Sequence, residues 1–309
     1  MAAHLPSLAA SAVAPFPEHE IIRRINACPK LASLQSINRA LDQLIRGDAT
    51  LNSQIASVIR RDPSLAARLL RMVNSVYSGL STRMNNLEEA VFFLGVRQIR
   101  ELSLATQVIE ELAQLQPTAA LTLPWRELWA HSISTAIITR EILANNAFDQ
   151  DDDTDYLVGL LHNVGKVVMA YAFPEALPVL IPLPAADPAD VCLHERQLIG
   201  WDHARIGAHF LARHQLSDEI VTAVHYHHTP ADSPRHTRYA AAVQVADYLV
   251  RHAGITGGFE NIAPIATDAW LDLPGWKILF ASDAAAASLT LTAITPSLRR
   301  LPSLLQTML

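Results

Sequence analysis

The chain has 309 residues, of which 50% are hydrophobic and 17% are charged, so it can bury a sizeable core and is not globally disordered. Its formal net charge is −6, which excludes a general duplex-DNA binder, because such proteins need a basic surplus to neutralise phosphates. The two cysteines, Cys28 and Cys192, are far apart and form no Cys-x-x-Cys pair. This spacing excludes a disulfide framework and is typical of a reducing cytoplasm.

No membrane association is predicted. Residues 1–17 are small and apolar but lack the Lys or Arg that opens a signal peptide, so we expect a flexible tail. The longest apolar stretch, residues 156–173, is interrupted by His162, Asn163 and Lys166, and no uninterrupted run of 18 apolar residues occurs. We therefore expect a cytoplasmic protein.

The first part of the chain is predicted to be a helical bundle over residues 18–115. Glycine is scarce, alanine and leucine abound, and no series of strands with period two is found. Apolar spacing of three and four, with Pro29 and Gly47 as stop signals and Asp62-Pro63 as a start signal, favours helices. The expected helices cover residues 18–28, 34–45, 50–60, 63–75, 87–94 and 96–115.

A second helical subdomain is expected over residues 125–253, after a junction at 116–124. Its predicted helices cover residues 125–145, 156–173, 189–199, 202–214, 217–228 and 235–253. The acidic segment 149–155 resembles a calcium loop but lacks the required Gly and Glu, so we interpret it as a solvated loop. A Gly-rich turn at 254–261 leads into a C-terminal helical extension, 262–309, with about three helices beginning near Pro264, Pro274 and Pro296.

Histidines are concentrated in the second subdomain, where eleven of the thirteen fall between His131 and His252. Neutral imidazoles and carboxylates are common metal ligands, and helices of a bundle can direct them inward. Five predicted helices carry candidates: His131; His162 with Asn163; His203; His227 and His228; and Asp247. The other histidines of this region are expected to be surface or packing residues: His194, His209, His214, His225, His236 and His252.

The order of these residues resembles the HD superfamily of metal-dependent phosphohydrolases, whose pattern is His, then His-Asp, then Asp. More specifically, residues 18–252 resemble the HDOD family, the HD-related output domain of bacterial signalling proteins. The motifs that carry this resemblance are Asp62-Pro63-Ser64-Leu65, Leu69-Leu70-Arg71, Asn74-Ser75, Glu89-Ala90, Leu94-Gly95, Gly-Leu-Leu-His-Asn-Val-Gly-Lys at 159–166, Glu195, Gly200, His203, Gly207-Ala208 and His227-His228-Thr229-Pro230.

The resemblance implies an all-α, multi-helix HDOD fold, with an N-terminal bundle packed on an HD-like subdomain. It also implies a divalent metal (Fe, Mn, Zn, Ni or Mg) held by His131, His162, His203, His227, His228 and Asp247, with Asn163 at the position of the family's bridging aspartate. Glu127 lies four residues before His131 on the same helix face and could also reach a metal. Lys166 could hold a phosphate or pair with an acid.

Asn163 departs from the catalytic pattern, because an amide offers one neutral oxygen and an N–H2 group that repels a cation. The Gly-Tyr-Pro motif of the related cyclic-di-GMP phosphodiesterases is also missing. Our leading hypothesis is therefore a non-catalytic regulatory protein that binds other signalling proteins or senses a nucleotide or phosphorylated ligand. A metal-dependent phosphohydrolase acting on a cyclic dinucleotide or other nucleotide is the alternative. A nucleic-acid-linked regulator is a third and weaker hypothesis, based on a basic cluster of Arg60, Arg61, Arg68 and Arg71.

Overall fold

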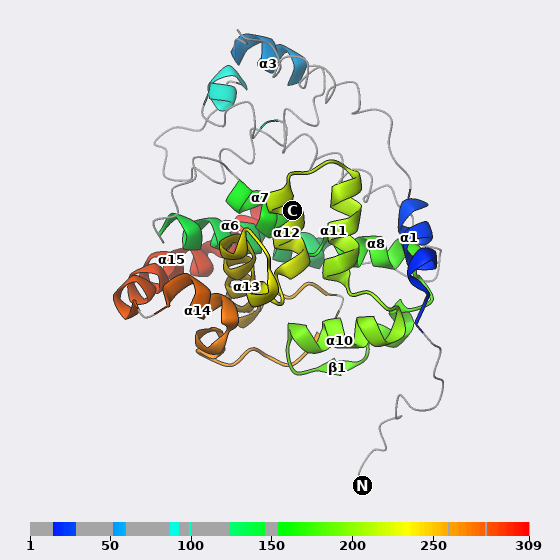
Figure 1. Cartoon of the computed structure of the whole chain (residues 1–309). Helices are drawn as coiled ribbons and strands as arrows, with labels where there is room; N and C mark the ends of the chain where they lie inside the picture. The colour runs from blue at the N-terminus through cyan, green and yellow to red at the C-terminus, as the bar shows by residue number, and fades with distance from the viewer. Residues whose placement is uncertain are drawn as a thin grey trace.

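The computed structural model is built almost entirely of helices, which confirms the predicted all-α class (Figure 1). It describes residues 15–28, 52–59, 87–92, 99, 124–145, 154–258, 260–281 and 283–308. The α-helices are α1 (Glu18–Asn26), α3 (Asn52–Ile59), α6 (Trp125–Ala144), α7 (Thr154–Leu161), α8 (Val164–Ala172), α9 (Leu177–Leu180), α10 (Pro188–Leu198), α11 (His203–Arg213), α12 (Asp218–Tyr226), α13 (Thr237–His252), α14 (Pro274–Phe280) and α15 (Ala284–Met308). There are also two 3-10 helices, η2 (Pro230–Asp232) and η3 (Ala269–Asp272), and two short strands, β1 (Pro184–Ala185) and β2 (Asn261–Ile262), and residues 87–92 are helical.

Helix starts in the second half follow the local chemistry of the sequence. Asp202 caps α11 by accepting a hydrogen bond from the backbone N–H of Arg205, and Asp187 caps α10 with Pro188 as its first residue. Pro274 is the first residue of α14, as predicted. These caps place the start of α11, and with it His203, at a defined point in the fold.

The prediction of one continuous helix over residues 156–173 is wrong. α7 ends at Leu161 and α8 begins at Val164. His162 Nδ1 lies 2.7 Å from the carbonyl oxygen of Gly159, and Asn163 is the N-cap residue of α8. The chain therefore turns at the two polar residues and directs both side chains into the interior.

One feature was not predicted, and two further expectations need correction. The parallel pairing of β1 with β2, which aligns Pro184 with Asn261, had no signal because each strand is only two residues long. Pro296 lies inside α15 rather than near a helix start. The helix predicted over 217–228 ends at Tyr226, so His227 and His228 lie in the turn that follows α12.

Close backbone contacts fix the helices around the site. α7 packs on α6, and a Cβ added to Gly159 would lie 2.6 Å from Ala136 Cα. α8 packs on α11, and a Cβ added to Gly165 would lie 1.8 Å from the carbonyl oxygen of His203. α13 packs against α6, α7 and α12. Glycine is required at both positions, because a side chain would separate helices that carry site residues.

Several predictions fall on other parts of the chain. The helices expected at 34–45 and 63–75, and most of that at 96–115, lie outside the described residues, as does most of the 149–155 loop, whereas residues 87–92 of the helix expected at 87–94 are helical. The predicted tail, 1–17, is described only from residue 15, and there the Phe16 ring lies 5.4 Å from the Phe173 ring.

In the part of the chain that the structure describes, no single helix is both long and apolar enough to cross a membrane, although the bent pair Pro274–Phe280 and Ala284–Pro302 passes by length and composition.

Candidate functional site

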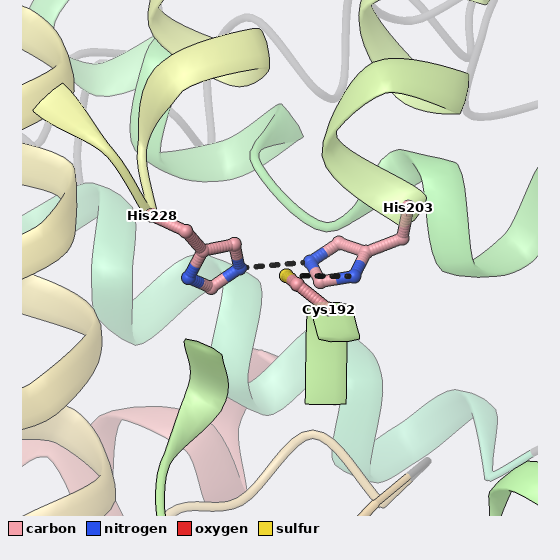
Figure 2. Close-up of side chains that lie close together, drawn as sticks. All are labelled: Cys192, His203 and His228. Atoms are coloured by element: carbon pink, nitrogen blue, oxygen red, sulfur yellow. Dashed lines mark hydrogen bonds between the residues drawn. The ribbon is translucent and has the colours of Figure 1, made fainter. Parts of the chain in front are cut away.

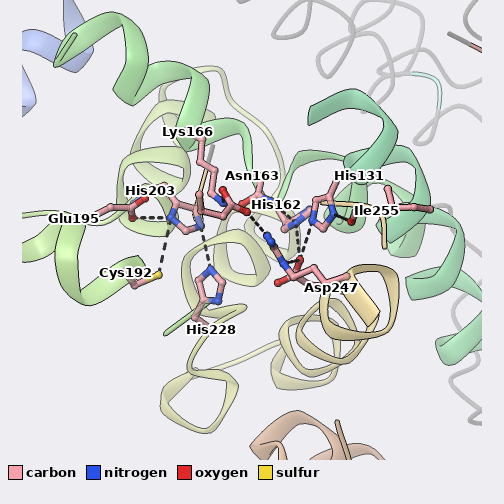
Figure 3. A network of polar contacts seen from close by, with 12 residues as sticks. His131, His162, Asn163, Lys166, Cys192, Glu195, His203, His228, Asp247 and Ile255 are labelled. Carbon is pink, nitrogen blue, oxygen red and sulfur yellow. Dashed lines mark hydrogen bonds and ion pairs between the residues drawn. The ribbon is translucent and has the colours of Figure 1, made fainter. Parts of the chain in front are cut away.

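His131, His162 and Asp247 come together in the interior. They are presented by α6, by the turn between α7 and α8, and by α13 (Figure 3). At most 1% of each residue is exposed. One ligand atom from each lies within 4.8 Å of the others, so this group could bind a metal. We call it the HD-like group.

Both imidazoles of the HD-like group contact backbone carbonyl groups. His162 Nδ1 donates to the carbonyl oxygen of Gly159, and burial lowers the pKa of His162 well below its usual value, so the ring is neutral and Nε2 carries a lone pair. Asn163 Nδ2 donates to that lone pair at 2.8 Å. His131 Nδ1 lies 2.9 Å from the carbonyl oxygen of Ile255, which leaves Nε2 facing Asp247 Oδ1 at 2.8 Å.

A buried network of four charged side chains continues from Asp247. Arg251 Nε donates to Asp247 Oδ1 at 2.8 Å, and Arg251 Nη2 lies 2.6 Å from Glu260 Oε1. Lys166 Nζ donates to Glu260 Oε2 at 2.7 Å, so Lys166 pairs with an acid. None of the four side chains is more than 3% exposed. Two cations balance two anions, and no charge in this network is left over.

The electrostatics of the two carboxylates follow from these contacts. Burial by itself raises the pKa of each group, but Arg251 and the neighbouring histidines hold the pKa of Asp247 well below its usual range. Lys166 and Arg251 likewise hold the pKa of Glu260 below its usual range. Both acids are therefore ionised at neutral pH.

His203 and His228 belong to a second cluster, beside Cys192 and Glu195 (Figures 2 and 3). His228 Nε2 lies 3.0 Å from His203 Nε2, and Cys192 Sγ lies 3.9 Å from His203 Nδ1. Glu195 Oε2 accepts hydrogen bonds from both Nδ1 and the backbone N–H of His203. Because Cys192, His203 and His228 each place a ligand atom within 4.8 Å of the others, this cluster too could hold a metal.

His227 lies between the two clusters. Its ring centroid is 3.9 Å from that of His228 and 5.3 Å from that of His162. Nδ1 lies 2.7 Å from the carbonyl oxygen of Val224. Burial, with a contribution from His203, lowers the pKa of His227 to about 3, so its Nε2 also carries a lone pair. A continuous row of imidazoles thus connects the two clusters.

Glu127 does not join either cluster, because its side chain is exposed on α6 whereas the six predicted imidazole and carboxylate ligands are largely or fully buried. The sequence reasoning missed Cys192, Arg251 and Glu260. Arg251 had a usable signal, since it lies four residues after Asp247 on one helix face. Cys192 and Glu260 had none, because only the tertiary fold brings them to the site.

The residues of the HD-like group fit a cation in their chemistry. Asn163 Oδ1 and His227 Nε2 are buried acceptors without a hydrogen-bond partner among the described residues, and buried polar atoms are rarely left so. Two contacts compete with a metal, however. The Asn163 amide occupies the His162 lone pair, and Arg251 already neutralises Asp247.

Comparison with known families matches the HDOD domain to residues 31–230. A protein of Treponema pallidum (strain Nichols) described as uncharacterized is 30% identical over 245 residues, which are 78% of this chain and 46% of the relative. The chain therefore spans about half the length of that relative.

Solved structures support the same fold. An HDOD domain protein of unknown function from Geobacter sulfurreducens superposes with a TM-score of 0.71 at 21% identity, covering 94% of this chain and 97% of that one. A protein of Marinobacter aquaeolei VT8, provisionally named a signal transduction protein, gives 0.61 at 21% identity, covering 94% and 63%. A protein of Shewanella amazonensis SB2B, provisionally named a phosphohydrolase, gives 0.58 at 19% identity, covering 94% of both chains.

Proposed function

Because the chain belongs to the HDOD family, we propose that it is a cytoplasmic signal-transduction protein whose HD-like group does not hydrolyse phosphate esters. It acts by recognising other signalling proteins or by sensing a nucleotide or other phosphorylated ligand. The provisional name of the Marinobacter relative agrees with this class of function.

One observation carries the proposal: the amide of Asn163 donates a hydrogen bond to His162 Nε2 at 2.8 Å. An aspartate in this position would add a negative charge for a cation, whereas the amide directs an N–H at the one atom of His162 that could bind it. Arg251 acts in the same direction, because its guanidinium occupies Asp247 Oδ1. His162 Nε2 and Asp247 Oδ1 are therefore already occupied by hydrogen-bond donors of the chain itself.

The alternative function is a metal-dependent phosphohydrolase. The unpartnered lone pair of His227 favours it, because a neutral imidazole nitrogen is suited to a metal ion. His131, His162 and Asp247 would hold the metal, which would supply a Lewis acid and an activated water. A set of two imidazoles and one carboxylate suits Fe, Mn, Zn or Ni better than Mg, which prefers oxygen ligands. Lys166 would not be free to bind a phosphate, because Glu260 holds it.

Hydrolysis assays distinguish the two functions. Purified protein is incubated with cyclic dinucleotides and with nucleoside monophosphates, with and without added Mn2+ or Fe2+. We expect no metal-dependent product. Metal-dependent hydrolysis that His162→Ala and Asp247→Asn abolish, but that His209→Ala retains, would overturn the proposal. His209 is a suitable control because it lies on α11, outside both clusters, 3.4 Å from Asn26.

A further inference from the structure

We propose that Gln244 is a positioning residue that couples the C-terminal helix α14 to the turn carrying His227 and His228. A partner that displaces α14 would therefore also release this turn. The inference deepens the proposed function, because it names a route by which the candidate site is regulated, and its biological use rests on that function. The coupling itself does not depend on what the site binds.

The amide of Gln244 forms a hydrogen-bonded bridge between two segments that are far apart in the chain. Its Nε2 donates to the carbonyl oxygen of His228 at 2.9 Å, and its Oε1 accepts from the backbone N–H of Gly275 at 2.8 Å. Gln244 is only 5% exposed. Because one end of an amide group donates and the other accepts, a single orientation of the side chain satisfies both segments. The bridge therefore fixes the position of the turn relative to α14.

At the α14 end, the bridge requires a close approach of two backbones. Gly275 follows Pro274 in the first turn of α14, where backbone N–H groups have no partner within the helix. A Cβ added to Gly275 would lie 2.7 Å from the carbonyl oxygen of Ala241 and 2.8 Å from Gln244 Oε1. Glycine is needed at this position, because any side chain would separate α14 from α13 and break the bond to Gln244.

At the other end, the bridge holds the backbone of a residue of the candidate site. α12 ends at Tyr226, and the backbone N–H of Thr229 donates to the carbonyl oxygen of Tyr226 at 2.9 Å, which closes the turn. The next element, η2, packs on both α13 and α14. The anchored residue is His228, whose Nε2 lies 3.0 Å from His203 Nε2. A shift of the turn would therefore change the contacts between these two imidazoles.

The contact between α14 and α13 indicates the kind of partner that could break the bridge. All residues of α13 from Tyr239 to Arg251 are buried, so this helix is covered on every side. α14 lies beside α13 (Figure 1) and packs against it. α14 itself buries Trp276, Leu279 and Phe280. Displacing α14 would expose this apolar surface to water, so the partner must offer an apolar surface in its place.

The family match does not account for this coupling. The match ends at residue 230, so His228 lies inside the matched segment, whereas Gln244 and Gly275 lie beyond it. The side chain that holds the turn and the helix that it connects to are both contributed by the C-terminal part of the chain. Regulation through α14 is therefore an addition to the matched domain.

Amide hydrogen exchange of the full-length protein tests the coupling, with mass spectrometry of peptides that cover residues 226–233 and 274–281. Gln244→Met removes both hydrogen bonds at nearly the same side-chain length. It should speed exchange in both peptides at least about fivefold, the effect of losing one buried hydrogen bond. Gly275→Ala changes only the α14 end and should nevertheless speed exchange in residues 226–233. The double variant should be no faster there than Gln244→Met, because both changes break the same bridge.

A second readout separates positioning from a general loss of stability. In protein with 13C-labelled histidine rings, Gln244→Met should shift the His228 resonance, which is assigned with His228→Gln. Ser297→Ala is the matched control, because it removes a different hydrogen bond of the C-terminal extension, to Glu141 on α6. This control should leave the His228 resonance and the exchange of residues 226–233 unchanged. Circular dichroism verifies that each variant is folded, and Gln244→Met decides the test if Gly275→Ala does not fold.

Either of two results would overturn the inference: unchanged exchange of residues 226–233 in Gln244→Met, or an equal increase in Ser297→Ala. Its failure can be distinguished from failure of the proposed function. Unchanged exchange together with absent hydrolysis would reject the coupling alone. Metal-dependent hydrolysis that requires His162, with the expected exchange pattern, would reject the proposed function alone.

Discussion

Replacing Glu260 by glutamine is expected to destabilise the protein strongly. Glu260 contacts two buried cations, with Lys166 Nζ 2.7 Å from Oε2 and Arg251 Nη2 2.6 Å from Oε1. Its side chain is 2% exposed, and those of the two cations are 3% exposed. Glutamine has nearly the same shape but no charge, so packing is preserved while the four-residue network changes from neutral to a net charge of about +1.

The magnitude follows from burial. Removing one partner of a buried ion pair typically costs about 3–5 kcal/mol, because the remaining charge stays desolvated. In this protein the amide N–H2 group would also face a cation, so we expect a loss at the upper end of that range. Lowering the pH should also destabilise the protein, because it removes the same charge from Glu260. Since the pKa of Glu260 is held below its usual range, its contribution to stability is present above the unfolded-state pKa and is lost as the pH falls.

Urea unfolding at neutral pH, followed by circular dichroism, measures the free energy of unfolding. The control is Glu18→Gln, which removes the exposed pair between Glu18 and Arg205, whose side chains are 62% and 46% exposed. Exposed pairs of this kind contribute less than about 1 kcal/mol. A loss for Glu260→Gln no larger than that of Glu18→Gln would show that the network does not stabilise the fold as we describe.

Three further predictions concern the site and its supporting helices. Asn163→Asp should raise the Mn or Fe content of the purified protein several-fold, measured by elemental analysis, and no gain would mean that Arg251 suffices to exclude a metal from Asp247. Gly165→Ala should destabilise by more than about 3 kcal/mol or prevent folding, because its Cβ would lie 1.8 Å from a backbone oxygen; a thermal melt within a few degrees of wild type would contradict this. In chelator-treated protein, stability should fall as the pH drops below about 6.5. The reason is that burial lowers the pKa of His227 to about 3, so the unfolded chain binds the proton first, at a cost of about 1.4 kcal/mol per pH unit; a flat profile between pH 7 and about 5 would refute it.

The fold could be predicted from sequence wherever local chemistry decides the outcome. The predicted helices over 18–28, 50–60 and 125–145 match α1, α3 and α6 closely, because apolar spacing and Pro29 act within one or two turns. The prediction failed at Pro296, where tertiary contacts outweigh the local penalty of proline. Ile294 and Leu301, on either side of it in α15, are fully buried, and Ser297 donates a hydrogen bond to Glu141.

Some residues of the candidate site could also be predicted from the sequence, and others could not. His131, His162 and Asp247 could be recognised because they occur in the order of the family pattern that the chain resembles. The structure brings the three together. The break between α7 and α8 was not predicted, although Asn163 is a favoured N-cap residue, because apolar residues continue on both sides of it. Arg251, Glu260 and Cys192 act only through contacts made in three dimensions, and no spacing rule connects Cys192 to His228.

The pairing of β1 with β2 determines which segment of the chain could be moved into another protein with its site complete. The family match ends at residue 230, yet Asp247, Arg251 and Glu260 all come later in the chain. The strand pair joins Pro184 to Asn261, and this places the neighbouring Glu260 against Lys166. A segment that ended at residue 230 would lack Asp247 and Glu260, the two carboxylates of the buried charge network. The smallest segment that carries a complete site into another protein must therefore extend at least to β2.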